Sequence, residues 1–214
     1  CTPAEMMKGA LKGAMTAKVQ RLELPELALL NRKWDIQANF SVLSDRSVEI
    51  FDMFGESDIG EFAGNFRLDP KREITAAHTT FALSHLKAFQ EHLPFTMDGA
   101  ISGEMAFDPA SATVVLTGSD ISCDTFVFQT ALGRIKAQKV GEKWQGIIGM
   151  KADSASFSLE GQTHFEADEN AVELNNIHLS SRQSHLAGNL TIDNQGFDGD
   201  LFLQMQNLKE LEGL

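Results

Sequence analysis

The sequence has no tyrosine, only two cysteines and only five prolines, whereas phenylalanine occurs 15 times. Cys1 and Cys123 cannot form a disulfide framework or a metal cluster by themselves, although a single bridge between them stays possible. Long hydrophobic runs are also lacking, since a stretch such as Leu27–Leu30 is far shorter than the roughly 18 apolar residues of a membrane-spanning helix. These absences exclude a disulfide-rich scaffold and a bundle of membrane-spanning helices.

Basic residues are scarce as well. Lys and Arg total 18 against 30 Asp and Glu, which gives a net charge of −12 and a sequence pI near 4.9. Nucleic-acid binding depends on clustered Lys and Arg that release counterions, so this balance argues against nucleic acid as a partner. It also disfavours simple electrostatic attachment to an anionic membrane surface.

Alternation of apolar and polar residues dominates the chain. In the clearest case, every second residue of Met97–Phe107 is apolar or Gly, and the residues between them are polar or Ala. A period of two predicts a strand with one dry face and one wet face, and such strands are typical of antiparallel sheets. Similar segments recur about every 10–14 residues with short polar turns between them, which predicts an all-β fold.

Two short helices are expected beside the strands. Thr2, Pro3 and Glu5 combine a cap, a first-turn proline and a capping-box glutamate, which predicts a helix over residues 1–14. The segment Ser84–Leu93 has apolar residues at helical spacing and is followed by a proline, so a second helix is predicted there.

Three segments share one pattern, in which two alternating apolar residues precede a Leu and a further apolar residue. They are Leu22–Leu30, Phe81–Phe89 and Leu203–Leu211, at a spacing near 60 residues. Either a Leu-rich chain matches itself by chance, or similar multi-strand units stack along one sheet.

Glycine repeatedly occupies the dry side of the predicted strands, where a packed core would favour larger residues. Glycine inside a strand indicates a bend, or the close approach of another group to the backbone. Two interpretations stay open: room for a bound chain, or bends in a strongly curled sheet. The positions are Gly64, Gly99, Gly103, Gly161, Gly188 and Gly199.

No catalytic motif is found. The sequence lacks the HExxH, GxSxG, P-loop and GxGxxG patterns, and the six His do not have the spacing of a zinc helix. Carboxylate pairs such as Glu160 with Glu166 are explained by a solvated strand face. The sequence therefore predicts no enzyme activity, no metal site and no cofactor.

Three runs of the sequence resemble the C-terminal part of the TamB proteins, in the AsmA-like family of bacterial envelope proteins. They are FALSHLKAF…PFTMDGAISGEMAFD, DISCDTFVFQTALGRIKAQKVGEKWQGIIGM and LNNIHLSSRQSHLAGNLTIDNQGFDGDLFLQMQNL. The cues are G-x-I-x-G-x-M-x-F after an L-x-x-F segment, and H-L-x-G-N-L-T-I followed by G-D-L-x-L. The likeness covers most of residues 75–214 and is less clear over residues 1–74.

The resemblance implies a long sheet folded lengthwise into a trough whose inside is apolar along its length. It also implies a periplasmic body, an inner-membrane anchor outside this segment and an outer-membrane TamA-like partner. The implied role is phospholipid transport between the inner and outer membranes, assistance with outer-membrane protein assembly and secretion, or both, with no catalytic residue.

We therefore expect an elongated, curled antiparallel sheet (a β-taco, or repeating β-groove) with one or two short helices. Residues 1–214 would form a single β-groove segment of a longer protein. The alternative is a closed β-sandwich, a binding or structural module of the cell envelope, in which the same alternation fills a packed core. The residues expected to line a groove for phospholipid acyl chains are Trp34, Ile36, Phe40, Met97, Ile101, Met105, Phe107, Phe157, Leu159, Phe165, Leu186, Leu190 and Ile192.

Overall fold

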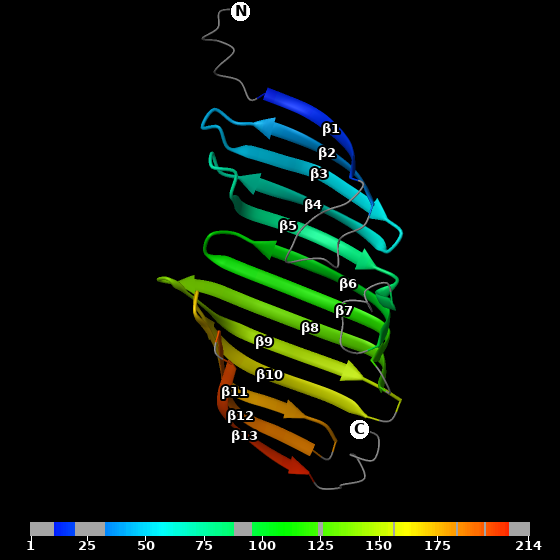
Figure 1. The fold of residues 1–214 in the computed structure, drawn as a ribbon, viewed down its shortest axis with the longest axis vertical. Coiled ribbons are helices and arrows are strands. Elements are labelled where there is room, and N and C mark those ends of the chain that lie inside the picture. Colours follow the sequence, from blue (N-terminus) through cyan, green and yellow to red (C-terminus); the bar gives the residue numbers. More distant parts are fainter. Residues whose placement is uncertain are drawn as a thin grey trace, which may run out of the picture.

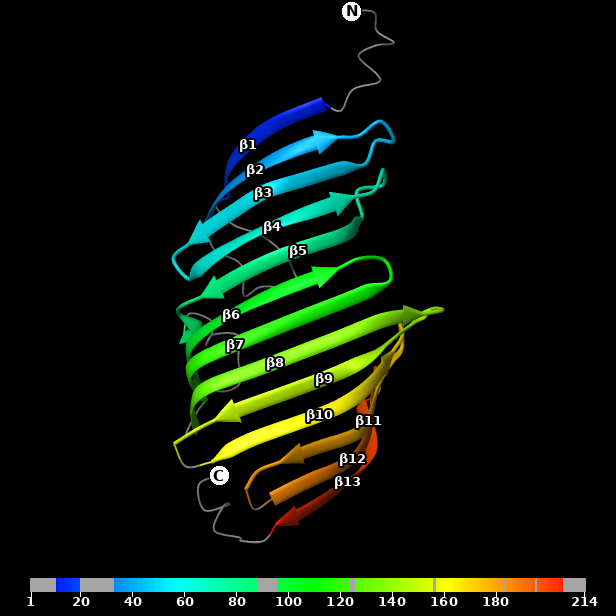
Figure 2. The ribbon, with the colours of Figure 1, turned by 180° about the vertical axis from the view of Figure 1, so that it is seen from behind.

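The structure, a computed structural model, contains one sheet in which every strand pairs with the next along the chain. It describes residues 11–19, 33–87, 96–123, 126–155, 157–182, 184–194 and 196–205. Figures 1 and 2 show the strands as a single twisted and curved layer. All pairs are antiparallel, and the strands are β1 (Leu11–Val19), β2 (Trp34–Val42), β3 (Val48–Ser57), β4 (Gly60–Leu68), β5 (Ile74–Leu83), β6 (Met97–Phe107), β7 (Ser111–Cys123), β8 (Phe126–Val140), β9 (Lys143–Asp153), β10 (Ser158–Ala167), β11 (Ala171–Ser180), β12 (Ser184–Asp193) and β13 (Gly196–Met205).

Aspartates close the turns along one long edge of the sheet, where the even-numbered strands end. The side chains of Asp45, Asp69, Asp108, Asp168 and Asp193 each accept a hydrogen bond from a backbone N–H two or three residues further on, at 2.8–3.1 Å. An Asp side chain that bonds the following backbone substitutes for a backbone turn, so the chain reverses in very few residues. We call this side of the sheet the Asp-turn edge.

The opposite edge is where the small core lies. Ile59, in the β3–β4 turn, and Leu86, just after β5, are 1% and 2% exposed and pack with Trp34. Partly buried residues of β2, β4, β5, β6 and β7 surround this cluster. We call this side the closed edge.

Four irregularities interrupt the pairing: one between β4 and β5 at Arg67 and Leu68, and three bulges that each contain a polar residue at positive φ. Asp52 (φ 50°), Asp120 (φ 49°) and Asn176 (φ 55°) are these residues. The N–H of Asp52 donates to Asn65 Oδ1 at 3.0 Å, and the N–H of Asn176 donates to Asn189 Oδ1 at 2.9 Å. One extra residue in a strand would move every later side chain of that strand to the other face of the sheet. A bulge prevents this, because it leaves the extra residue unpaired and the alternation then continues on the same faces.

The chain exposes much more surface than a compact monomer. Its accessible area is 14709 Å², whereas roughly 9,800 Å² is typical of a compact protein of 23.5 kDa. A single layer explains the difference, because neither face of the sheet is covered by a second layer of strands among the described residues. The predicted elongated antiparallel sheet is thus confirmed, and a two-sheet sandwich is not observed in the described part of the chain.

The helix predictions fare differently. Residues 1–10 of the first predicted helix lie outside the described residues, but Leu11–Ala14 belong to strand β1, so for them the prediction is wrong. Gly13 lies opposite Phe40, whose ring covers it, and this strand pairing outweighs the weak helical spacing. Of the second predicted helix, Leu86 and Lys87 form a short 3₁₀ turn and residues 88–95 lie outside the described part. Among the residues described, no helix is long and apolar enough to cross a membrane.

The Asp turns predict an acid-dependent stability. Hydrogen bonds from the Ala110 N–H and from Ser111 lower the pKa of Asp108, and the Asn170 and Ala171 N–H groups lower that of Asp168. A folded-state pKa below the unfolded value near 3.8 stabilises the protein above that value, and the stabilisation is lost as pH falls through the folded pKa. We expect Tm to be level from pH 7 to about 5 and to drop below about pH 4.

The Asp108→Ala variant should melt below the parent at pH 7, and the gap should close toward pH 2–3 in scanning calorimetry. Asp200 is an exposed carboxylate of β13 outside any turn, so Asp200→Ala is the control. A gap for Asp108→Ala that stays constant down to acid pH would contradict this role of the turn carboxylates.

Candidate functional site

The pairing register sorts the strand residues onto two faces. Residues directly opposite in an antiparallel pair face the same way, and neighbours along a strand face opposite ways. Following this rule from β2 to β13 places a continuous set of apolar side chains on one side, which we call the apolar face. Its larger members include Trp34, Ile36, Phe40, Val42, Val48, Ile50, Met53, Phe62, Phe66, Leu68, Phe81, Leu83, Met97, Ile101, Met105, Phe107, Val114, Leu116, Ile121, Ile135, Trp144, Ile148, Met150, Leu159, Phe165, Val172, Leu174, Ile177, Leu179, Leu186, Leu190, Ile192, Phe197, Leu201 and Leu203.

The opposite side, the polar face, carries the charges. Within the described strands every Asp, Glu and His lies on it, apart from Asp52 and Asp120 at the bulges. A few apolar side chains also face that way, including Phe54, Ile147 and Phe202. Charged side chains are therefore almost confined to one face across twelve consecutive strands, β2 to β13, whereas apolar side chains occur on both faces.

The apolar face is not sealed. Met150 and Ile192 are 44% and 43% exposed, and Leu201 at the far end is 53% exposed. A sandwich core would bury these side chains almost completely. Burial is concentrated near the closed edge of β2–β7, around Trp34, Ile59 and Leu86, and the face becomes more accessible toward β13.

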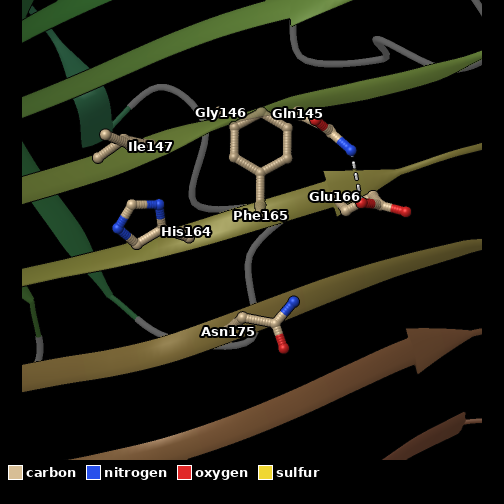
Figure 3. Close-up of a pocket in the computed structure, with 7 residues that line it drawn as sticks. All are labelled: Gln145, Gly146, Ile147, His164, Phe165, Glu166 and Asn175. Carbon is tan, nitrogen blue, oxygen red and sulfur yellow. Dashed lines mark hydrogen bonds between the residues drawn. The ribbon is translucent and has the colours of Figure 1, made fainter. Parts of the chain in front are cut away.

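Phenylalanine rings cover several glycines of the apolar face. Directly opposite cross-strand pairs join Gly13 with Phe40, Gly55 with Phe62, Gly103 with Phe81 and Gly146 with Phe165. A Cβ added at these glycines would lie 2.3–2.8 Å from atoms of the facing ring. Figure 3 shows the Phe165 ring beside Gly146.

Of the six glycines whose role the sequence leaves open, only Gly103 is covered by a ring. At Gly64, Gly99, Gly188 and Gly199 an added Cβ would instead meet a backbone carbonyl oxygen of a neighbouring strand at 2.0–2.6 Å, and at Gly161 it would meet the Leu179 side chain at 2.5 Å. At Gly13, Gly55 and Gly103 the nearest group is the ring of the neighbouring strand, and at Gly146 the Lys136 carbonyl lies closer than the Phe165 ring, so these glycines do not leave a gap for a bound chain. The rings lie against the sheet beside the other apolar side chains. We call this layer of side chains on the apolar face the floor. Aromatic side chains that cover a cross-strand glycine also stabilise the pairing.

Twelve of the thirteen predicted lining residues lie within strands and face the apolar side together. The thirteenth, Phe157, precedes β10 and packs edge-on against Phe128, with ring centroids 5.6 Å apart. That they line a lipid groove stays a prediction. Members such as Ile50, Phe62, Phe81, Ile148 and Leu179 were not among the predicted residues. These residues show the same alternation, but the face of the sheet on which their side chains lie follows only from the strand pairing and the positions of the bulges.

A shallow polar depression of about 350 Å³ lies over β9–β11, with Ile147, His164, Glu166 and Asn175 on the polar face around it (Figure 3). Glu166 accepts hydrogen bonds from Lys143 Nζ and from Gln145 Nε2, the latter at 2.7 Å. These donors lower the pKa of Glu166, and the same carboxylate raises the pKa of Lys143. The arrangement is a surface ion-pair network, which contributes little to stability in water.

Other titratable groups of the described strands are dispersed. His78 Nε2 lies 2.7 Å from Glu104 Oε1, and the rings of His178 and His185 are in contact at 4.4 Å. No group of three or more His, Cys, Asp and Glu side chains that could hold a metal ion occurs in the described part of the chain. Cys123 is a free, partly buried cysteine, and Cys1 lies outside the described residues.

No protein-family model matches this sequence, and comparison with curated proteins and with solved structures finds no significant match.

The ring-on-glycine contacts predict unequal effects of two Gly→Ala changes. In Gly55→Ala the new Cβ would lie 2.3 Å from Phe62 Cε1, and the Phe62 ring is held by Trp34 at 5.2 Å. We expect a loss of about 1–3 kcal/mol in the free energy of unfolding, measured by denaturant titration. Gly133 is the control, because its added Cβ would meet only Leu116 carbons at 3.7 and 3.9 Å. Gly133→Ala should be neutral or stabilising by up to about 1 kcal/mol, and equal losses would contradict the interpretation.

Two threonines on the apolar face predict opposite effects of Thr→Val. The Thr79 hydroxyl is buried without a hydrogen-bond partner, whereas Thr163 Oγ1 donates to the Asn175 carbonyl at 3.1 Å. We expect Thr79→Val to raise the free energy of unfolding by about 1 kcal/mol and Thr163→Val to lower it by a similar amount. Denaturant titration of both variants checks this, and a destabilised Thr79→Val would show that the hydroxyl has a partner in solution.

Proposed function

We propose that this chain is a periplasmic segment of a TamB-like envelope protein and that its apolar face conducts phospholipid acyl chains between the inner and outer membranes. The observation that supports the proposal is the half-exposed apolar face, which continues through every strand from β2 to β13 on a single-layer sheet. In the full-length protein an inner-membrane anchor and an outer-membrane TamA-like partner would complete the bridge.

The physical advantage of such a path is large. An acyl chain in water costs about 0.8 kcal/mol per exposed CH₂, so one long chain costs on the order of 10 kcal/mol. Eleven strand-to-strand steps from β2 to β13, at about 4.8 Å each, give an apolar path of roughly 53 Å, longer than the hydrocarbon core of a bilayer. An acyl chain can therefore stay in apolar contact along the whole sheet while its head group remains in water.

The form of the floor also favours movement over fixed binding. Flat rings over glycine give a surface with few steps, and the charged side chains face the other way. A second role, assistance with outer-membrane protein assembly and secretion, would use the same face for apolar strands of a client protein. The closed sandwich requires side chains such as Met150 to be buried, and they are not.

Two residues of β9 provide a matched test. Met150 lies on the apolar face and is 44% exposed, whereas Ile147 lies on the polar face and is 40% exposed. Glu at position 150 would have to be desolvated beneath a bound acyl chain, so Met150→Glu should weaken binding of a fluorescent phospholipid by at least about tenfold. Ile147→Glu should bind like the parent, and both variants should melt alike.

Three outcomes decide the proposal. Loss of binding in Met150→Glu alone supports it, and equal binding by both variants would place the lipid elsewhere. A parent protein that takes up no phospholipid from vesicles would overturn it. Ile101 is less suitable for this test, because it packs against the buried Trp34 cluster and a charge there would disturb folding.

A further inference from the structure

Apart from the bulge residues Asp52 and Asp120, which lie outside the regular pairing, one charged side chain of the described strands lies on the apolar face. Lys139 shares this face with Ala137, two residues earlier in β8, and lies directly opposite Trp144 of β9. Lys139 is exposed and Trp144 is partly buried. An isolated cation at the border of an apolar surface is unusual, because charged side chains otherwise stay on the polar face here.

The position of Lys139 in the sheet is specific. It lies one residue before the end of β8, at the Asp-turn edge, and its N–H donates to the Ala110 carbonyl at 2.8 Å in the adjacent turn. The neighbouring turn carboxylates Asp108 and Asp168 accept hydrogen bonds from their own turns. In the part of the chain that the structure describes, Lys139 makes no ion pair with them or with any other carboxylate.

The two long edges of the sheet therefore differ in polarity. At the closed edge Ile59 and Leu86 fold over the apolar face, while at the Asp-turn edge the turns are short and charged and Lys139 borders the floor. An amphiphile on this face gains most when its chain lies on the floor and its head group reaches water at the Asp-turn edge. Tryptophan suits such a border, since its ring packs on apolar groups and its N–H can remain hydrated.

We propose that Lys139 and Trp144 form a head-group site for the phosphate of a phospholipid whose acyl chain lies on the apolar face. The inference rests on the proposed function and adds to it where the head group is held and which amphiphiles are preferred. The lysine ammonium acts as a point charge that binds phosphate oxygens, as lysines do in other phosphate sites. Amphiphiles with a phosphate should therefore bind better than neutral ones with the same chain.

The experiment compares two probes with one acyl chain, palmitoyl lysophosphatidylcholine and monopalmitoylglycerol. Each displaces the neutral fluorophore N-phenylnaphthylamine from the full 214-residue chain, below the micellar concentration of either probe. The parent should bind the lysophospholipid several-fold more tightly than the glyceride. Lys139→Gln should remove this preference and leave the affinity for the glyceride unchanged.

Lys136→Gln is the matched control, because Lys136 is exposed on the polar face of the same strand. It should keep the parent's preference. Glycerophosphocholine, which has the same head group without a chain, should not displace the fluorophore or compete with the lysophospholipid. Strong competition by glycerophosphocholine would indicate a site for soluble phosphate esters and would overturn the lipid assignment.

The outcomes also separate this inference from the proposed function. If neither palmitoyl probe displaces the fluorophore, both proposals fail. If both probes bind equally to the parent, or if Lys139→Gln and Lys136→Gln behave alike, only the head-group site is overturned. Circular dichroism melts of both variants should match the parent, since each lysine side chain is exposed.

Discussion

The rest of this structure depends on the register of the strand pairing, that is, on which residues of neighbouring strands lie opposite each other. Side chains alternate with a period of two, so one unpaired residue anywhere would move every later side chain of that strand to the other face. The sheet nevertheless keeps its polarity from β2 to β13 because the extra residues Asp52, Asp120 and Asn176 are absorbed in bulges. Polar residues that tolerate positive φ occupy all three positions, which is why the correction involves little strain.

Two of these bulges are stabilised in the same way. An asparagine on the next strand, Asn65 or Asn189, accepts the N–H of the bulge residue, and each belongs to an Ala-Gly-Asn triplet. The preceding strand contains Val-Glu at or near its start in both cases, at Val48 and Val172. The same features thus recur in the pair β3–β4 and the pair β11–β12. Val48 and Val172, Asp52 and Asn176, and Asn65 and Asn189 are separated by the same number of residues, so the two pairs are repeats of one unit. The predicted repeat near 60 residues involves other segments, and Leu22–Leu30 lies outside the described residues.

Sequence reasoning predicted the fold because alternation is a local property. The strand Met97–Phe107, for example, has the bounds that its pattern indicated. The sheet face on which a side chain lies could be predicted within a strand but not across a bulge. In Val48–Phe54 both the even-numbered and the odd-numbered positions include apolar residues. Only the pairing shows that Phe54 lies on the polar face and Met53 on the apolar face.

Contacts between strands were beyond the reach of the sequence pattern. That a phenylalanine would cover each of four glycines follows from register, as does the position of Lys139 on the apolar face. The helix prediction for Leu11–Ala14 failed for the same reason, since Gly13 is weakly helical alone and favourable beneath the Phe40 ring. Local signals therefore predicted the elements, and long-range pairing determined the site.

A sheet of this kind is stabilised mainly within its layer. Side chains on the apolar face gain contact with cross-strand neighbours, as Phe62 does with Gly55 and Trp34, but they gain little from burial beneath a second layer. Exposed apolar side chains such as Leu201 and Phe197 contribute little to folding and favour association with other apolar groups. Polar residues at those positions would serve a purely structural sheet better. The persistence of apolar residues from β2 to β13, with almost all charges on the opposite face, therefore supports the proposed contact between this face and acyl chains.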